Sequence, residues 1–192
     1  MDASNNWGRL FHYVGQAWSG QRSVTLPQAA AIPYATIGVR FGDNPEGILV
    51  LATGDNGNYI RTSVSHVAIE THDGRIIRTS GIGKDLSGLL FRTTDPIVTH
   101  EHGENIRIMD FQDMNLFGLP VRCNISDRGS RTLEILGQPI VTRQTDESCR
   151  SEILNCAFTN SFWTDSSGTV WKSVQHIHPD SLPITIEVLR PP

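Results

Sequence analysis

The sequence of 192 residues has no surplus of basic residues and no long apolar run. Lys and Arg together number 16, against 20 for Asp and Glu, and the formal net charge is −4 with His neutral. Proteins that bind a nucleic-acid backbone normally present a basic surface, so we expect no nucleic-acid partner. The longest clean apolar run, residues 48–52, is far shorter than the roughly 20 residues of a membrane-spanning helix.

Cysteine is also scarce. The three cysteines, Cys123, Cys149 and Cys156, show no C-x-x-C spacing, so they do not predict a zinc site. Cys149 and Cys156 are close enough in sequence to close a hairpin in an oxidising compartment, and this pair is the candidate disulfide. A pairing of Cys123 from a neighbouring strand and three reduced thiols stay open as alternatives.

The first twenty residues carry apolar side chains at helical spacing. Positions i, i+3, i+4, i+7 and i+11 are Trp7, Leu10, Phe11, Val14 and Trp18. This period predicts an amphipathic helix over residues 1–20, followed by a link over 21–33. The polar side of the helix lacks the Lys and Arg of a membrane-surface helix, which favours packing against a sheet over contact with a membrane or partner.

From residue 34 onward, short apolar runs alternate with turn signals about every 8–12 residues, a spacing typical of antiparallel β proteins. Glycine supplies the positive φ of tight hairpins at Asn56-Gly57, Asp73-Gly74 and residues 166–168. We therefore predict a mainly β chain whose residues 34–192 form an antiparallel meander, with a short second helix at 86–91. No linker divides the chain, so residues 1–192 are expected to be one domain.

The last predicted hairpin would bring two tryptophans together. If residues 166–168 form a three-residue loop, Trp163 lies opposite Trp171 on one face of the sheet. Such a pair could stack on sugar rings, or it could pack in the core, which is the more common role of paired aromatics. With Trp18, these residues are the candidate surface for a glycan or a partner.

Two H-x-H pairs are weak candidates for metal ligands. His100 and His102, like His176 and His178, would share one face if each pair lay in a strand. The glutamate that follows the second histidine in the cupin signature is missing, and solvated histidines near strand ends are the more ordinary interpretation. Nucleophile-elbow and phosphate-loop motifs are also missing, so we expect no enzyme activity and no cofactor.

Several stretches together resemble a known family. They are the segments 32–37, 44–52, 72–79, 162–173 and 182–191. In this order they look like the YjbF/GfcB family of group 4 capsule and exopolysaccharide lipoproteins. The resemblance implies a large curved antiparallel sheet, half-barrel-like, with the N-terminal amphipathic helix and one short helix packed in its concavity.

The resemblance also implies a location and a role. Family members are secreted, are processed at a lipobox cysteine, and are anchored by acyl chains to the periplasmic face of the outer membrane. This chain has no cysteine near its start, so the anchor would belong to a fuller precursor. The family has no established catalytic residues, and none is transferred here.

We therefore expect a non-enzymatic factor that assists assembly or export of a capsule or exopolysaccharide. Its partners would be the polysaccharide or other proteins encoded in the export operon. Two alternatives remain: a carrier of acyl chains in the cavity of the curved sheet, and, with less support, a metal-dependent enzyme that acts on polysaccharide through the H-x-H pairs.

Overall fold

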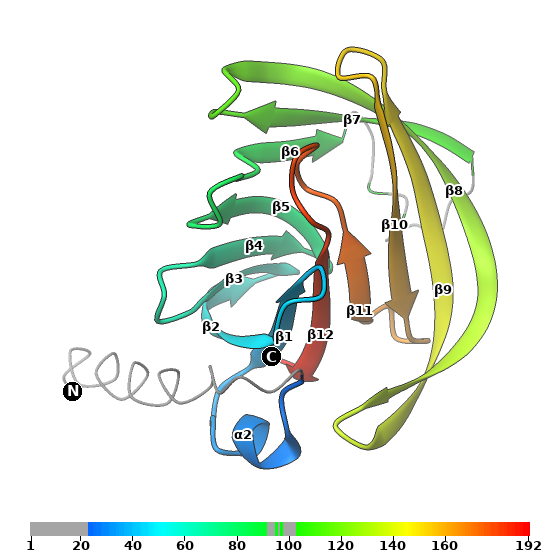
Figure 1. The fold of residues 1–192 in the computed structure, drawn as a ribbon. Helices are drawn as coiled ribbons and strands as arrows, with labels where there is room; N and C mark the ends of the chain where they lie inside the picture. Colours follow the sequence, from blue (N-terminus) through cyan, green and yellow to red (C-terminus); the bar gives the residue numbers. More distant parts are fainter. Residues whose placement is uncertain (1–22, 92–94, 96, 98–102) are drawn as a thin grey trace.

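The computed structural model describes residues 23–91, 95, 97 and 103–192 (Figure 1). These residues form one short helix, α2 (Leu26–Ala30), and one sheet of twelve strands. The strands are β1 (Thr36–Phe41), β2 (Gly47–Asp55), β3 (Asn58–Thr62), β4 (Ala68–His72), β5 (Arg75–Ser80), β6 (Gly88–Phe91), β7 (Gly103–Phe111), β8 (Leu116–Ile135), β9 (Gln138–Ser151), β10 (Cys156–Thr164), β11 (Val170–Gln175) and β12 (Ile184–Arg190).

The sheet curls until its two edges meet. Its order is β5-β4-β3-β2-β1-β12-β11-β10-β9-β8-β7-β6, so two meanders are joined by the antiparallel pairing of β1 with β12. At the edges, the backbone N–H of Thr79 in β5 donates to the carbonyl of Leu86, just before β6, at 2.9 Å. The predicted β meander is confirmed, but the sheet is nearly closed and barrel-like, which is a greater closure than a half-barrel.

Two of the predicted turns show why the meander forms. Asn56 and Gly57 have φ values of 48° and 83°, and Asp73 and Gly74 have 45° and 84°. Positive φ at both central residues gives the turn whose twist matches that of paired strands. These two hairpins lie at the same end of the barrel as the C-terminal residues Pro191 and Pro192, because all of them border one cavity.

The predicted helix over residues 86–91 is wrong. Residues 88–91 form β6, which pairs antiparallel with β7. Leu89 is buried whereas its neighbour Leu90 is 67% exposed, the alternation of a strand. The predicted helix over residues 1–20 lies outside the described residues.

Helix α2 packs on the outer face of the sheet. The backbone N–H of Thr25 donates to the Gln28 side-chain carbonyl at 2.8 Å, which caps the first turn. After the helix, Ile32 is buried against Ile48 and Val50 of β2. Leu49, between these two, belongs to the core on the inner face, so α2 lies outside the barrel and does not occupy its concavity.

The inner face holds the main core, and one side chain joins opposite walls across it. The core includes Ile37, Leu49, Ile69, Ile76, Met109, Phe111, Leu119 and Ile186. Gln175 of β11 accepts from the backbone N–H of Ile76 and donates to the carbonyl of Gly74, both at 2.9 Å. These bonds fix β11 against β5, which is not its neighbour in the sheet.

The disulfide differs from the predicted pairing. Cys149 bonds to Cys123, its direct partner across β8 and β9, and Cys156 is a free thiol. The Cys149–Cys156 pairing is therefore wrong: Cys156 lies opposite Ser151, two residues beyond Cys149 on β9.

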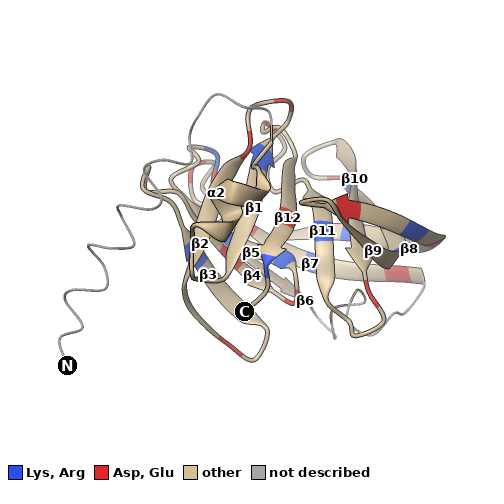
Figure 2. Ribbon diagram, turned by 90° about the horizontal axis from the view of Figure 1, so that it is seen from below, with Lys and Arg blue, Asp and Glu red and all other residues tan. Residues whose placement is uncertain are grey.

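Acidic and basic residues are interspersed along the strands, as Figure 2 shows from below. In the described part of the chain, no helix has the length and apolar character needed to cross a membrane.

Candidate functional site

A cluster of four charged side chains lies inside the barrel. Arg75 of β5 is 1% exposed and forms two-pronged hydrogen bonds with two carboxylates. Its Nε and Nη2 donate to Asp95 at 2.6 and 3.1 Å, and its Nη1 and Nη2 donate to Glu147 at 3.0 and 3.1 Å. The rings of Phe91 and Phe162 lie 4.9 and 4.8 Å from its guanidinium carbon. Arg75 is therefore held rigidly. Burial lowers the pKa of Arg75, but the charges of Glu147 and Asp95 and their hydrogen bonds outweigh burial and raise it.

Glu147 of β9 is the shared acceptor of the cluster. It is fully buried and also accepts from Arg107 Nη1 at 2.7 Å and from Asn160 Nδ2 at 2.9 Å. Burial alone would raise the pKa of Glu147, but the charges of Arg107 and Arg75 and the hydrogen bonds outweigh burial and lower it to about 2. The carboxylate is therefore ionised at neutral pH and acts as a structural counter-charge.

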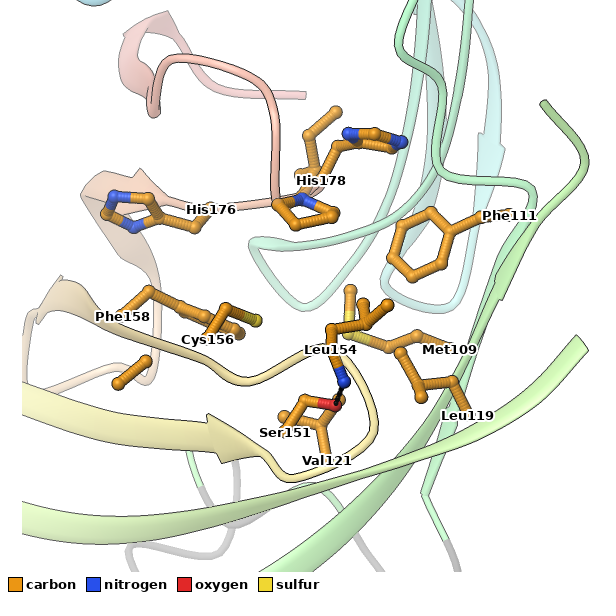
Figure 3. A pocket seen from close by; sticks show the side chains of 13 residues that line it. Met109, Phe111, Leu119, Val121, Ser151, Leu154, Cys156, Phe158, His176 and His178 are labelled. Carbon is orange, nitrogen blue, oxygen red and sulfur yellow. Dashed lines mark hydrogen bonds between the residues drawn. The ribbon is translucent and has the colours of Figure 1, made fainter. Parts of the chain in front are cut away.

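Beside this cluster lies a small apolar cavity, which we call the His176 cavity (Figure 3). Its volume is about 130 Å³, and apolar side chains such as Met109, Phe111, Leu119 and Leu154 form most of its wall. Phe158 also borders it and covers the guanidinium of Arg107 at 5.3 Å. Ligand pockets usually measure about 300–1,000 Å³, so this cavity is below their range.

Both histidines of the second H-x-H pair border the His176 cavity, beyond the end of β11. Burial lowers the pKa of His176, and the charge of Arg107 acts in the same direction. His178 Nδ1 accepts from the backbone N–H of Asp180 at 3.1 Å, and its Nε2 lies 3.3 Å from an oxygen of Asp113. The two imidazole rings therefore have different surroundings: His176 lies near Arg107, and His178 contacts Asp113 and Asp180.

The structure gives these histidines no third metal ligand within the described residues. There, the one group of three close ligands is Cys123, Glu147 and Cys149, and its two sulfurs are bonded to each other. His100 and His102 lie outside the described residues, so the first H-x-H pair stays a candidate from sequence alone.

The larger cavity, which we call the Arg61 cavity, lies at one end of the barrel. Residues of β3, β4 and β11, the loop between β10 and β11, and the C-terminal residues Pro191 and Pro192 all border it. Its volume is about 440 Å³, within the range of ligand pockets. Its polar wall is formed by Tyr59, Arg61, Thr71, Asp73, Thr169 and Ser173. Ile37 and Ile186 supply part of its apolar wall. A wall of this mixed character suits a ligand that has both polar groups and apolar C–H faces.

The predicted tryptophan pair does not form. A bulge after Trp163 pairs this residue with Lys172, so Trp163 lies on the outer face. Trp171 points inward, where it packs on the core and donates from Nε1 to Asp165 at 2.7 Å. The predicted placement of Trp163 opposite Trp171 on one face is therefore wrong, although each tryptophan singly stays a candidate contact residue. Trp18 lies outside the described residues.

Sequence reasoning missed the arginines that line the interior. Arg107, Met109 and Phe111 alternate on the inner face of β7, and Arg61 takes the corresponding place on β3. The signal was available in the sequence: alternation along each strand places these arginines on the same face as the buried apolar residues, which predicts buried charge.

Comparisons with known proteins agree on one family. The family model described as "Group 4 capsule polysaccharide lipoprotein gfcB, YjbF" matches residues 16–189. The chain is 24% identical over 175 residues to the uncharacterized lipoprotein GfcB of Escherichia coli (strain K12), a match that covers 88% of this chain and 82% of the relative.

A solved structure has the same fold. The crystal structure of the hypothetical lipoprotein YmcC from Escherichia coli (K12) matches with a TM-score of 0.81 at 21% sequence identity, over 100% of this chain and 97% of that one. At this identity the likeness establishes the fold alone.

Proposed function

Because the chain belongs to the YjbF family of group 4 capsule polysaccharide lipoproteins, we propose that it assists the assembly or export of a capsule or exopolysaccharide. In this proposal it is a non-enzymatic protein that binds the glycan. Other proteins encoded in the export operon are its further partners.

The proposed location is the periplasmic face of the outer membrane, with attachment through a lipid anchor. Lipoprotein membership supports a place in the cell envelope. The Cys123–Cys149 disulfide is a second support, since disulfides persist mainly in oxidising compartments such as the periplasm.

The Arg61 cavity is the observation that carries glycan binding. It offers about 440 Å³ with hydroxyl, aromatic, charged and apolar groups together, which is the mixture that a sugar unit requires. The acyl-carrier alternative would need a long apolar cavity. The His176 cavity is mostly apolar but offers only about 130 Å³, so it favours the glycan over the acyl chain.

Deletion of the gene in its native host, followed by complementation, tests the proposed function. Surface-bound, released and intracellular polysaccharide are quantified separately in the three strains. We expect a fall at the surface with retention inside the cell, and recovery on complementation. A fall in all three fractions would indicate a role in synthesis.

Normal polysaccharide in every fraction would contradict the proposed function and would revive acyl-chain transport as the alternative. A displacement assay with an apolar dye then tests that alternative directly. A glycan-binding protein should leave the dye free, whereas an acyl carrier should bind it and release it on addition of fatty acid.

A further inference from the structure

Among the residues that the structure describes, Arg61 is a buried cation without a counter-charge. It projects from β3 to the inner face and is only 6% exposed. Its Nη1 donates to Thr71 Oγ1 at 3.0 Å, and the ring of Tyr59 lies 4.8 Å from its guanidinium carbon. Its Nε is buried and has no hydrogen-bond partner within the described residues. One strong donor of the guanidinium therefore remains unused.

The contrast with the other two buried arginines lies in the counter-charge, because Nε and Nη2 of Arg107 also lack a hydrogen-bond partner within the described residues. Arg75 and Arg107 both form ion pairs with Glu147, whereas Arg61 forms none within the described residues. The carboxylate of Asp73 borders the same cavity, but it lies 3.3 Å from Nε2 of His72. Burying a charge without a partner is unfavourable, and a bound anion would offset that cost.

Burial lowers the pKa of Arg61 to about 10, and the neighbouring Tyr59 acts in the opposite direction. The guanidinium is therefore still positive at neutral pH. A planar guanidinium with free N–H groups is the side chain best suited to a carboxylate or a phosphate.

The rest of the Arg61 cavity points to a sugar as the carrier of that anion. Hydroxyls of Thr71, Thr169 and Ser173 can exchange hydrogen bonds with sugar hydroxyls. The Tyr59 ring and Ile186 offer apolar faces to sugar C–H groups. A free inorganic anion would leave most of a cavity of about 440 Å³ unfilled.

We propose that the Arg61 cavity binds an acidic sugar unit of the polysaccharide, with the carboxylate or phosphate of that unit bound to the Arg61 guanidinium. This inference rests on the proposed function and adds the class of ligand and the residue that selects it.

The test compares probes that differ in the anionic group. Glucuronate, glucose 6-phosphate, glucose and inorganic phosphate are titrated into the full chain by isothermal titration calorimetry. We expect at least one acidic sugar to bind in the millimolar range or tighter, and glucose to bind at least about tenfold more weakly. The acidic sugar that binds better identifies the anionic group. Strong dependence of the affinity on salt should accompany binding.

Variants locate the site. Arg61→Met removes the charge and keeps most of the volume, and should weaken binding of the acidic sugar by about tenfold or more. Arg131→Met, at an exposed position on β8, is the matched control and should bind as the unchanged protein does. Should Arg61→Met fail to fold, Arg61→Lys serves instead: it keeps the charge but lacks the planar fork, and should also bind more weakly.

Three results would overturn the inference: no saturable binding of either acidic sugar in the millimolar range, equal binding of glucose and glucuronate, or unchanged binding in the Arg61 variants. Equal binding of inorganic phosphate and both acidic sugars would show that only the anion is recognised, and would overturn the assignment to a sugar.

Complementation of the deletion strain separates this inference from the proposed function. If the gene carrying Arg61→Met restores surface polysaccharide fully, the inference is wrong while the proposed function stands. If the probes bind through Arg61 but deletion leaves polysaccharide unchanged, the site is correct and the proposed function is wrong.

Discussion

At the scale of single residues, the interior of the barrel tolerates charge because most of it is compensated. Arg75 and Arg107 face Asp95 and Glu147, so the formal charge of the cluster is zero. Aromatic rings cover both guanidinium groups, which keeps water away and makes each ion pair more sensitive to the loss of its partner. Glu147 contacts both arginines and is therefore the residue whose loss should matter most.

We predict that Glu147→Gln destabilises the protein by about 3–5 kcal/mol, because two buried guanidinium groups would then share Asp95 alone. Denaturant unfolding measures the change. Glu134→Gln, at an exposed position on β8, is the matched control and should change stability by less than about 0.5 kcal/mol. Equal stability of the two variants would show that the ion pairs contribute nothing to folding.

The same carboxylate should make stability depend on acid pH. The pKa of Glu147 falls from 4.5 to about 2 on folding, so its contribution is complete above 4.5 and is lost as the pH falls from 4.5 towards 2. The shift corresponds to a contribution on the order of 3 kcal/mol. We therefore expect the stability difference between the unchanged protein and Glu147→Gln to shrink on acidification below 4.5. Parallel pH profiles of the two proteins would contradict this assignment.

At the scale of elements, short sequence motifs predicted the turns correctly but did not predict which residues pair across neighbouring strands. Asn56-Gly57 and Asp73-Gly74 specify their hairpins through residues that adopt positive φ, and the structure has both. The register of the β10–β11 hairpin depends on a bulge at Trp163/Thr164, which puts Trp163 and Trp171 on opposite faces. Nothing local in the sequence signals that bulge, because it follows from how β10 and β11 pack into the curved wall.

The predicted helix over residues 86–91 failed for a related reason. Leu86 and Leu89 are spaced as on a helix, and both are buried. Pairing with β7 at the edge of the sheet decides the conformation instead. Pairing with a strand that is distant in sequence thus outweighs the helical spacing of two apolar residues.

For the disulfide, we predict that Cys149→Ser destabilises the protein by about 3 kcal/mol. The bond closes a loop across 26 residues and so restricts the unfolded chain. Cys156→Ser, which removes the free thiol, should leave stability close to that of the unchanged protein. Thermal or denaturant unfolding without reductant measures both changes.

Thiol counting checks the pairing itself. The unfolded, unreduced protein should show one free thiol, and alkylation followed by peptide mapping should place it at Cys156. A label on Cys123 or Cys149 would contradict the pairing across β8 and β9.

At the scale of the whole molecule, the family resemblance predicted the curved sheet but not its near closure. The seam lies between β5 and β6, which follow each other in sequence yet form opposite edges of the sheet. Side chains from distant segments hold the walls together: Arg75 of β5 reaches Glu147 of β9, and Gln175 of β11 reaches the backbone of β5. These partners are 72 and 99 residues apart, so no local pattern predicts them.

Because these contacts join the walls on both sides of the seam, we predict that the described barrel unfolds as one unit. The transitions followed by far-UV circular dichroism and by tryptophan fluorescence should coincide, since opening the seam exposes the ionic cluster and the core together. Gln175→Met would leave the backbone groups of Gly74 and Ile76 without their partner. The loss of one buried and one partly buried hydrogen bond should lower the free energy of unfolding by about 2–4 kcal/mol, and with it the midpoint. Gln138→Met, at an exposed position, is the control and should leave the midpoint unchanged. In a variant that carries Trp7→Phe and Trp18→Phe, only Trp163 and Trp171 report the fluorescence. An earlier fluorescence transition in that variant would mean that β10 and β11 unfold separately, and that the contacts between β11 and β5 are too weak to make the barrel cooperative.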